Sequence, residues 1–395
     1  MEETVIVSGV RTPFGTFGGA LAGTSAIDLG SLVVKEAMSR VGIDGRQVDE
    51  VLMGNVIQAS LGENPARQVL VKAGVDVSVP AMTVNKVCGS GMKTLALADQ
   101  AIRLGDAEII VAGGMENMSR APYLLPGARY GYRMGDGALV DSLMQDGLMC
   151  GIENCHMGVT AENVAVDYKV SREEMDEFAA WSQQKVAKAQ EAGRFADEIV
   201  PVSIPQRRGD PVIFDKDEHP RADTTLDRLS KLPPAFMGEG GSVTAGNSSG
   251  INDGGAAAVV MSRSRAERLG LKPLGFIRAF AAAGVPPRVM GIGPIPATRK
   301  VLKKAGLELK DIELFELNEA FASQSVAVIR ELGLDKDKVN VNGGAIALGH
   351  PVGASGTRIV ITLLYEMARR DLRYGLATMC CGGGMGVAMV LERPR

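Results

Sequence analysis

The sequence predicts an α/β layered fold that consists of two similar halves with a long insertion between them. Short apolar runs that are typical of buried strands occur at residues 4–8, 50–53, 81–85 and 109–112. Helical patterns lie between these runs at residues 27–41 and 91–104. Alternation of strands and helices is typical of layered α/β folds, and it defines the fold class that we expect.

The second half of the chain repeats the order of elements in the first half. The paired segments are 41–53 with 305–315, 83–91 with 340–355, and 108–114 with 375–384. A duplicated α/β unit is the simplest account of a match that extends over about 100 residues. Chance recurrence of βα units, which are a frequent building block, is the alternative.

Residues 119–244 differ in composition from both halves, with more Met, Pro and charged residues and with irregularly spaced Gly. They contain one clear amphipathic helix at 171–191, which Ser171 and Glu174 open as a capping box. Long insertions in compact folds usually serve function, so we expect a lid or a binding subdomain here. The predicted organisation is a first half at 1–118 and 245–271, a loop domain at 119–244, and a second half at 272–395.

The bulk composition argues against several classes of function. The chain has 395 residues, of which 46% are hydrophobic and 23% charged, with a formal net charge of -3 and a pI of about 5.8. Basic residues form no long run, so we expect no nucleic-acid partner. No apolar stretch is as long as a membrane span and the start reads as a strand, so we expect neither a membrane segment nor a signal peptide.

The five cysteines are an odd number in a large chain, which argues against a disulfide framework and for a reducing, cytoplasmic location. The adjacent pair Cys380 and Cys381 has no second pair at zinc spacing, so we expect no metal site. The chain has neither a Walker phosphate loop nor a Gly-x-Gly-x-x-Gly after the first strand. Nucleotide-dependent hydride or phosphoryl transfer is therefore unsupported.

Cys88 is the first candidate for a reactive group. It stands between a predicted strand and a predicted helix, flanked by Gly89 and Gly91. A thiol at a helix N-terminus feels the positive end of the helix dipole, which predicts a pKa below the usual value of about 8.5 and a thiolate nucleophile. The glycines permit a sharp turn and let a substrate approach the backbone amides. The alternative is a small buried apolar side chain.

His350 and Cys380 lie in two further glycine-rich segments. His350 is one of three histidines, and its loop occupies the place in the second half that Cys88 occupies in the first. An imidazole there is able to activate a thiol and to polarise a carbonyl. Cys380 follows the last repeated strand. The alternative for Cys380 is a structural thiol, or a vicinal pair with Cys381 that is open to oxidation.

Four motifs in this order resemble the thiolase family. They are Val-Cys-Gly-Ser-Gly around Cys88, Asn-Glu-Ala-Phe from Asn318, Gly-His-Pro-Val-Gly-Ala-Ser-Gly around His350, and Gly-Gly-Gly-Met-Gly shortly after Cys380. The resemblance runs nearly end to end and includes residues 156–163 and 243–250. It implies duplicated βαβαβαββ halves of five strands each, packed as a five-layered α-β-α-β-α core, with an inserted loop domain that covers the active site and binds coenzyme A.

The resemblance also implies roles for five residues. Cys88 would accept the acyl group as a thioester, and His350 would activate Cys88. His350, with a water held by Asn318, would form an oxyanion hole for the thioester of the second substrate. Cys380 would move the proton to and from the α-carbon or the leaving thiolate. The amides of Cys88 and Gly382 would form a second oxyanion hole, in which each donor is typically worth about 2.7–4 kcal/mol.

For the substrate, the resemblance implies contacts with coenzyme A and with the acyl group. The implied residues are Leu148, His156, Met157, Arg221, Ser249 and Ile251 for coenzyme A, with Met290 and Phe321 closing the acyl pocket. Closure by these two side chains favours a short acyl chain. Arg221 lies in an irregular loop and reads equally as a solvated side chain, and Ile251 reads equally as core at the start of a strand.

The implied activity is that of an acetyl-CoA C-acetyltransferase, which interconverts two acetyl-CoA with acetoacetyl-CoA and free CoA. The nearby alternative is a degradative thiolase with longer 3-oxoacyl-CoA substrates. A ketoacyl or hydroxymethylglutaryl synthase would leave Cys380 without a function, and a non-catalytic acyl-CoA carrier would not need the four motif residues together.

Further expectations follow from the same resemblance. We expect coenzyme A thioesters as substrates, no bound cofactor, a place in lipid metabolism, and a homotetramer formed as a dimer of dimers, or a dimer. Cys381 departs from the family pattern, in which a branched aliphatic residue is common at this position. The departure leaves open which of the two adjacent thiols is functional.

Overall fold

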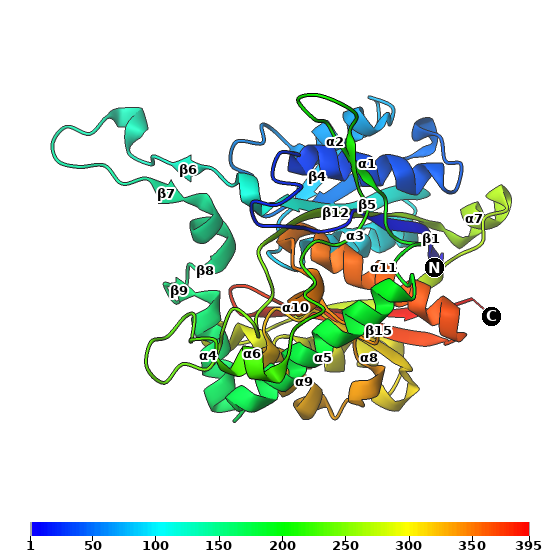
Figure 1. Ribbon diagram of the computed structural model, residues 1–395. Coiled ribbons are helices and arrows are strands. Elements are labelled where there is room, and N and C mark those ends of the chain that lie inside the picture. The colour runs from blue at the N-terminus through cyan, green and yellow to red at the C-terminus, as the bar shows by residue number, and fades with distance from the viewer. Residues whose placement is uncertain (1, 395) are drawn as a thin grey trace.

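The computed structural model describes residues 2–394 and has five alternating layers of helix and sheet in its core (Figure 1). Its layer helices are α1 (Ala26–Ser39) and α2 (Pro65–Ala73) on one outer face, α3 (Ser90–Leu104) and α11 (Val352–Arg370) in the centre, and α8 (Pro294–Ala305) and α9 (Ala322–Leu332) on the other outer face. Three buried apolar clusters fill the space between the layers. The predicted layered α/β class is confirmed.

The first sheet has the strand order β4-β3-β5-β12-β1. Its strands are β1 (Thr4–Arg11), β3 (Glu50–Gly54), β4 (Ala81–Val84), β5 (Ile109–Asn117) and β12 (Asn252–Ser262), with the short β2 (Gly15–Thr16) paired to β12. β3 is parallel to β4 and β5, whereas β12 is antiparallel to β5 and β1. Parallel neighbours require crossover connections, and α2 and α3 supply them.

The second sheet repeats this topology with the order β14-β15-β16-β13. Its strands are β13 (Gly275–Gly284), β14 (Leu314–Leu317), β15 (Tyr374–Cys381) and β16 (Met385–Glu392). The two sheets meet where β1 pairs with β13, at Val5 with Phe276 and Ile6 with Gly275. Both halves therefore follow one order of elements, as the sequence repeat predicts.

The second sheet differs from the expected five strands at its outer edge. Where β4 lies in the first half, the second half has only an isolated parallel bridge between Val339 and Phe315. The next residue, Asn340, adopts a φ of 44° and turns the chain away. Its side-chain amide accepts from the Leu317 amide at 2.8 Å and donates to the Leu317 carbonyl at 2.8 Å. This one side chain thus satisfies backbone groups that a fifth strand would otherwise pair.

Strand β5 is longer than predicted, because it continues to Asn117 instead of ending at residue 112. A Cβ on Gly114 would lie 2.0 Å from the Gly353 carbonyl oxygen, so glycine here allows a close approach of α11 and does not end the strand. Strand β1 likewise continues to Arg11 instead of ending at residue 8, whereas the other predicted helices and strands begin and end close to the observed ones. The predicted capping box is present, with Ser171 and Glu174 at the start of α5 (Arg172–Glu191).

The two central helices approach each other closely at their N-terminal ends. A Cβ on Gly91 would lie 2.6 Å from Thr357 Oγ1, and a Cβ on Gly356 would lie 2.4 Å from the Met92 backbone nitrogen. The Thr357 hydroxyl donates to the Gly91 carbonyl at 3.0 Å. Because glycine has no Cβ, the loops that precede both helices can lie face to face.

The chain leaves the core after β5 and returns at β12. The exact boundaries of the loop domain, given above as 119–244, stay a prediction. The hairpin of β6 and β7 projects from the body as an arm (Figure 1). The elements of the insertion are β6 (Tyr123–Leu124), β7 (Val140–Asp141), a π-helix (Leu143–Leu148), β8 (Met149–Cys150), β9 (Cys155–His156), α4 (Met157–Asp167), α5, β10 (Val202–Ile204), β11 (Val212–Phe214) and α6 (Leu226–Ser230). The remaining short elements are α7 (Arg263–Leu269), α10 (Ala345–Leu348) and 3-10 turns at Gly45–Gln47, Met118–Arg120, Ala128–Tyr130, Pro287–Ile292, Leu309–Asp311 and Lys336–Lys338.

A buried ion cluster ties the insertion to the core. Arg11 in β1 donates to Glu198 at 2.6 Å and to Asp217 at 2.6 and 2.9 Å, and all three side chains are buried. Burial disfavours the charged guanidinium, but the two carboxylates outweigh it and raise the pKa of Arg11. Removing one partner of such a buried pair typically costs about 3–5 kcal/mol.

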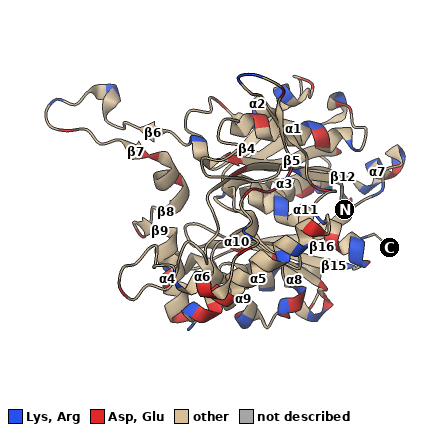
Figure 2. Cartoon of the chain, viewed as in Figure 1, with Lys and Arg blue, Asp and Glu red and all other residues tan. Residues whose placement is uncertain are grey.

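Outside this cluster, positive and negative residues are intermixed over the outer helices (Figure 2). The formal net charge of -3 therefore reflects a near balance of charge and not a face of one sign. Within residues 2–394, no helix combines the length and hydropathy that a membrane span requires.

Replacing Gly356 by Ala is expected to destabilise the protein by about 1–3 kcal/mol, because the added methyl group meets the Met92 backbone in a packed core. The matched control is Gly23→Ala, since no heavy atom lies within 4 Å of the position of its Cβ. Urea unfolding of both variants and the parent measures the difference. Equal midpoints for the two variants would mean that the central helices have room to separate.

Candidate active site

Cys88 lies on a strained turn between β4 and α3. Val87 adopts a φ of 51°, in the left-handed region that a β-branched residue rarely enters. Asn85 Oδ1 accepts from the Val87 amide at 2.9 Å, and the Ser90 hydroxyl donates to the Val87 carbonyl at 2.6 Å. Strain of this kind persists only where the surroundings impose it, and it clusters at functional sites. The turn therefore marks Cys88 independently of its chemistry.

Cys88 is a partly exposed residue whose thiol has backbone amides near it. The backbone amides of Gly382 and of Cys88 itself lie close enough to the thiol to lower its pKa, and the side chain packs against a buried cluster that contains Val56, Met118 and Val352. Burial raises the pKa of Cys88 to about 11, and the two amides offset only part of this rise. The prediction of a lowered pKa and a resting thiolate is therefore wrong, because lost hydration outweighs the helix terminus. At rest, Cys88 is a neutral thiol.

His350 is a buried imidazole whose tautomer follows from its neighbours. The Ser355 hydroxyl lies 2.6 Å from His350 Nδ1 and donates its one hydrogen to the Pro351 carbonyl at 2.9 Å. Ser355 therefore accepts from Nδ1–H, which leaves Nε2 unprotonated, 3.3 Å from the Asn318 amide nitrogen. Burial, and to a smaller extent the charge of Arg358, lowers the pKa of His350 to about 3. The ring is a neutral base.

Asn318 follows β14 and is fully buried beside His350. Among residues 2–394, its Oδ1 has no hydrogen-bond partner. Buried amide oxygens are normally paired, so an unpaired one next to a candidate base is suited to a water or a ligand group.

Cys380 and Cys381 end β15, and their side chains point to opposite faces of the sheet. Cys380 belongs to the apolar cluster that contains Met290 and Phe321. Cys381 packs in the central cluster instead, where a Cβ on Gly89 would lie 2.7 Å from its Sγ. Burial raises the pKa of both thiols. Of the two, Cys380 shares its surroundings with the predicted acyl pocket.

A cavity of about 540 Å³ lies beside these groups. The predicted residues on its wall are Leu148, His156, Arg221, Ser249, Ile251, Phe321 and His350. Met157, Met290 and Cys380 lie in an apolar cluster that also contains Phe321. Met157 contacts the turn after β15, since a Cβ on Gly382 would lie 2.6 Å from its Cε. The structure thus brings the predicted coenzyme A and acyl-pocket residues together, whereas Cys88, Asn318 and Gly382 are not on this wall, and the roles of all these residues stay predictions.

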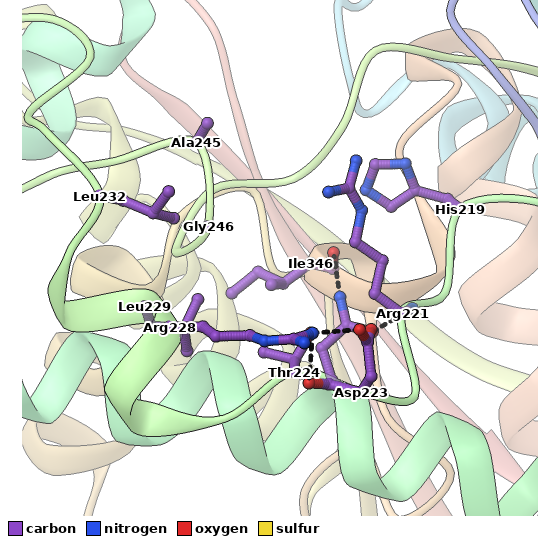
Figure 3. Close-up of a pocket in the computed structure, with 11 residues that line it drawn as sticks. His219, Arg221, Asp223, Thr224, Arg228, Leu229, Leu232, Ala245, Gly246 and Ile346 are labelled. Atoms are coloured by element: carbon purple, nitrogen blue, oxygen red, sulfur yellow. Dashed lines mark hydrogen bonds and ion pairs between the residues drawn. The ribbon is translucent and has the colours of Figure 1, made fainter.

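A second hollow of about 370 Å³ adjoins the first and shares His219, Arg221 and Ala245 with it. Figure 3 shows the Arg221 side chain beside the His219 ring, and Arg228 paired with Asp223. Within the described residues, Arg221 makes no ion pair. Its guanidinium is therefore available to an anionic group that enters this hollow.

Several residues on the cavity wall were missed from the sequence. His219 and Phe236 both line the cavity, and Phe236 stacks on the His156 ring with centroids 4.6 Å apart. The rarity of histidine was an available signal, because all three histidines of the chain line this cavity. Phe236 lies in an irregular segment, where no periodic pattern marks it. The other missed residues are Thr16, Phe17, Met118, Ala235, Ala245, Ser248, Gly250 and Val352.

Glu116 has a buried carboxyl group that supports the loop carrying His350. It accepts from the amides of Val56 and Ile57 at 3.0 and 3.1 Å and from the Gly353 amide at 3.0 Å. Gly353 lies in the first turn of α11, shortly after His350. Burial raises the pKa of Glu116 to about 8 despite these donors. The bonds hold the start of α11 against the first half.

Together these groups suit acyl transfer: a nucleophile, a second thiol within electrostatic reach of it, nearby backbone amides, and a neutral base on the wall of the cavity. Among the residues described, no group of three or more His, Cys, Asp or Glu side chains is placed to hold a metal ion.

Comparison with known proteins adds evidence that is independent of this geometry. The chain matches the thiolase N-terminal domain over residues 4–264 and the thiolase C-terminal domain over residues 271–393. Two acetyl-CoA acetyltransferases, from Pseudomonas aeruginosa and Escherichia coli, are each 58% identical to it, over 393 and 394 residues, with 100% of both chains covered. A crystal structure of the Bacillus anthracis acetyl-CoA acetyltransferase is similar with a TM-score of 0.97 at 46% identity, covering 100% of this chain and 99% of that one.

Cys88 is expected to react slowly with iodoacetamide at neutral pH, because the thiolate is the reacting form and its pKa is about 11. The rate should rise about tenfold for each pH unit between pH 7 and 9, since the thiolate fraction does so below the pKa. Mass spectrometry of the peptide that contains Cys88 follows the reaction. A rate that levels off between pH 7 and 8 would mean that the helix terminus governs the pKa after all.

Proposed function

The chain belongs to the thiolase family, and on this premise we propose that it is an acetyl-CoA C-acetyltransferase. The reaction converts two acetyl-CoA reversibly into acetoacetyl-CoA and free CoA through an acetyl-Cys88 intermediate. Relatives that bear the name acetyl-CoA acetyltransferase and match end to end support this substrate class. In this proposal coenzyme A thioesters are the substrates, and the protein holds no further cofactor.

The proposal rests on three reactive groups from separate loops, of which Cys88 and Cys380 lie within electrostatic reach of each other and His350 lines the cavity. The Gly382 amide lies close enough to Cys88 to lower its pKa, His350 presents an unprotonated Nε2, and Cys380 lies in the cluster of the acyl pocket. Simple acyl transfer needs one nucleophile and one base. The additional thiol supplies the acid and base that carbon–carbon bond formation requires.

Acyl transfer to Cys88 follows from the protonation states at rest. Cys88 attacks the carbonyl carbon of the first acetyl-CoA while its proton moves to His350 Nε2. The amides of Cys88 and Gly382, which lie near the thiol at rest, then donate to the oxyanion that forms beside it. The CoA thiolate leaves and takes the proton of Cys380. Acetyl-Cys88, free CoA, a protonated His350 and a Cys380 thiolate result.

Carbon–carbon bond formation restores the starting state. The Cys380 thiolate removes a proton from the α-carbon of the second acetyl-CoA, and His350 Nε2–H and a water on Asn318 stabilise the enolate oxygen. The enolate carbon attacks the carbonyl of acetyl-Cys88, and acetoacetyl-CoA forms. The departing Cys88 thiolate takes its proton back from His350. Proton transfer by a placed side chain typically contributes about 10²–10⁴-fold.

The two adjoining hollows suit the two ends of coenzyme A. Leu148 and Ile251 give the cavity of about 540 Å³ an apolar wall for the pantetheine chain, and Ser249 offers a hydroxyl to the pantetheine amides. Arg221 also lines the second hollow of about 370 Å³, where its positive charge suits the anionic nucleotide end of coenzyme A.

A short acyl chain fits the predicted acyl pocket at Met290 and Phe321 better than a long one. Met290 and Phe321 are 4% and 8% exposed and belong to the same apolar cluster as Cys380. A longer 3-oxoacyl chain would have to displace these packed side chains, which is costly in a close-packed interior. The degradative, long-chain alternative is therefore not favoured.

The proposal includes a homotetramer, formed as a dimer of dimers, that acts in the cytoplasm and in lipid metabolism. The arm of β6 and β7 exposes large side chains away from the body, with Tyr130 91% and Met134 95% exposed (Figure 1). Clustered apolar side chains on a surface usually mark a contact with another chain. The five free thiols suit a reducing compartment. Light scattering of the purified protein measures its mass, and a monomer would contradict the tetramer.

The protein is expected to cleave acetoacetyl-CoA with free CoA, and to cleave a medium-chain 3-oxoacyl-CoA much more slowly. Chromatography of the thioesters measures both rates. Cys88→Ala is expected to lower kcat by at least about 10³-fold, because the acyl group then has no acceptor. If the parent cleaves neither substrate, the assignment is refuted.

Cys380→Ser and Cys381→Ser provide a matched pair in the same assay. Cys380→Ser is expected to lower kcat by about 10²–10⁴-fold, because a hydroxyl is a far weaker acid than a thiol and rarely forms the anion that would remove the α-proton. Cys381→Ser is expected to change kcat by less than about tenfold, since its side chain only packs in the core. The opposite ranking would assign the proton transfer to Cys381.

A further inference from the structure

Cys150 and Cys155 face each other across the short ladder of β8 and β9. The register pairs Met149 with His156 and Cys150 with Cys155. Directly paired residues of an antiparallel ladder have Cα atoms about 4.5 or 5.5 Å apart and side chains on one face. Both spacings fall in the range of about 4.4–6.8 Å that disulfides span. Both residues are free thiols in the structure.

The two thiols differ in access to solvent. Cys150 is 1% exposed, whereas Cys155 is partly exposed. Burial raises the pKa of Cys155, and the nearby sulfur of Cys150 adds to this rise, so the two groups lie within electrostatic reach. A dissolved oxidant therefore reacts with Cys155 first. Cys150 is the neighbouring thiol that can then attack the oxidised Cys155 and release the group bound to it.

The hairpin that carries both cysteines is part of the wall of the substrate cavity. Leu148 precedes it and His156 ends it, and both line the cavity. At the tip, Ile152 lies 3.9 Å from the position of a Cβ on Gly383, next to the turn that presents the Gly382 amide. A covalent link across the hairpin would therefore restrain the wall on two sides of the bound thioester.

We propose that Cys150 and Cys155 form a redox site that closes to a disulfide and thereby alters substrate binding. The site is separate from Cys88, Cys380 and Cys381, to which the reaction and the core packing are assigned. The effect on substrate rests on the proposed function, whereas formation of the disulfide does not.

The oxidant in this proposal is a low-molecular-weight disulfide. The Cys155 thiolate attacks one sulfur of the small disulfide, which forms a mixed disulfide and releases one small thiol. The Cys150 thiolate then attacks the sulfur of Cys155 and releases the second small thiol. The two cysteines lose two electrons and two protons in all, and the small disulfide gains both.

Peptide mapping after treatment with oxidised glutathione tests the site directly. Trypsin releases residues 134–169, which contain Cys150 and Cys155 and no other cysteine, and it releases Cys88 separately in residues 87–93. The expected product is a 134–169 peptide that is two hydrogens lighter and resists alkylation until it is reduced. A peptide 134–169 that keeps two free thiols, or that carries glutathione without closing, would overturn the proposal.

Two single variants check the order of the steps. Cys150→Ser is expected to accumulate glutathione on Cys155, because no second thiol can displace it. Cys155→Ser is expected to leave Cys150 as a free thiol, because that side chain is 1% exposed. Glutathione on Cys150 in the second variant would overturn the assignment of Cys155 as the first thiol to react.

A kinetic assay then compares the oxidised parent with the double variant Cys150→Ser, Cys155→Ser after the same treatment. Both preparations are first shown to contain reduced Cys88. In the oxidised parent, the KM for acetoacetyl-CoA is expected to change by about threefold or more, while kcat stays within about twofold. This pattern is expected when binding of the substrate and of the transition state changes equally. An unchanged KM in protein with a mapped disulfide would overturn the effect on binding. An untreated parent that cleaves no thioester would instead refute the proposed function and leave the mapped disulfide standing.

Discussion

The packing of α3 against α11 is the contact on which the site depends. Each helix begins beside a loop with a reactive side chain, Cys88 before α3 and His350 before α11. Glycines at the contact let the backbones approach, so the two loops lie close to each other between the halves. Glu116 strengthens the contact, because it reaches from the first half to the Gly353 amide. A duplicated fold thereby turns two equivalent helix starts into one site, with a nucleophile on one side and a base on the other.

Burial controls the reactivity of this site. A Cys88 pKa of about 11 and a His350 pKa of about 3 keep the proton on sulfur until a substrate arrives. Each unit of that difference corresponds to about 1.36 kcal/mol, so charge separation without a substrate is strongly disfavoured. A bound thioester changes the balance, because negative charge then develops on an oxyanion that the Cys88 and Gly382 amides can stabilise. The thiol is therefore reactive toward a carbonyl held at those amides and unreactive elsewhere.

The fold and most of the site could be predicted because their signals are local. Apolar runs mark the strands, Ser171 caps its helix through residues next to it, and glycines flank Cys88 in the sequence itself. The pKa of Cys88 could not be predicted in this way, because the buried side chains that it packs against, such as Val56 and Val352, come from distant segments. For the same reason nothing local shows that the amide of Asn340 takes over the hydrogen bonds of a missing strand.

The insertion separates substrate binding from the chemistry. The reactive side chains all come from ends of core strands and starts of core helices, namely Cys88, Asn318, His350 and Cys380. Much of the surrounding wall comes from the insertion, which Arg11 fastens to β1 through Glu198 and Asp217. Because the two sheets fix the core positions, a change in the insertion can alter how a thioester is held without moving the nucleophile. A hairpin with two paired thiols in this part of the chain is thus placed to act on binding while the geometry of Cys88 stays the same.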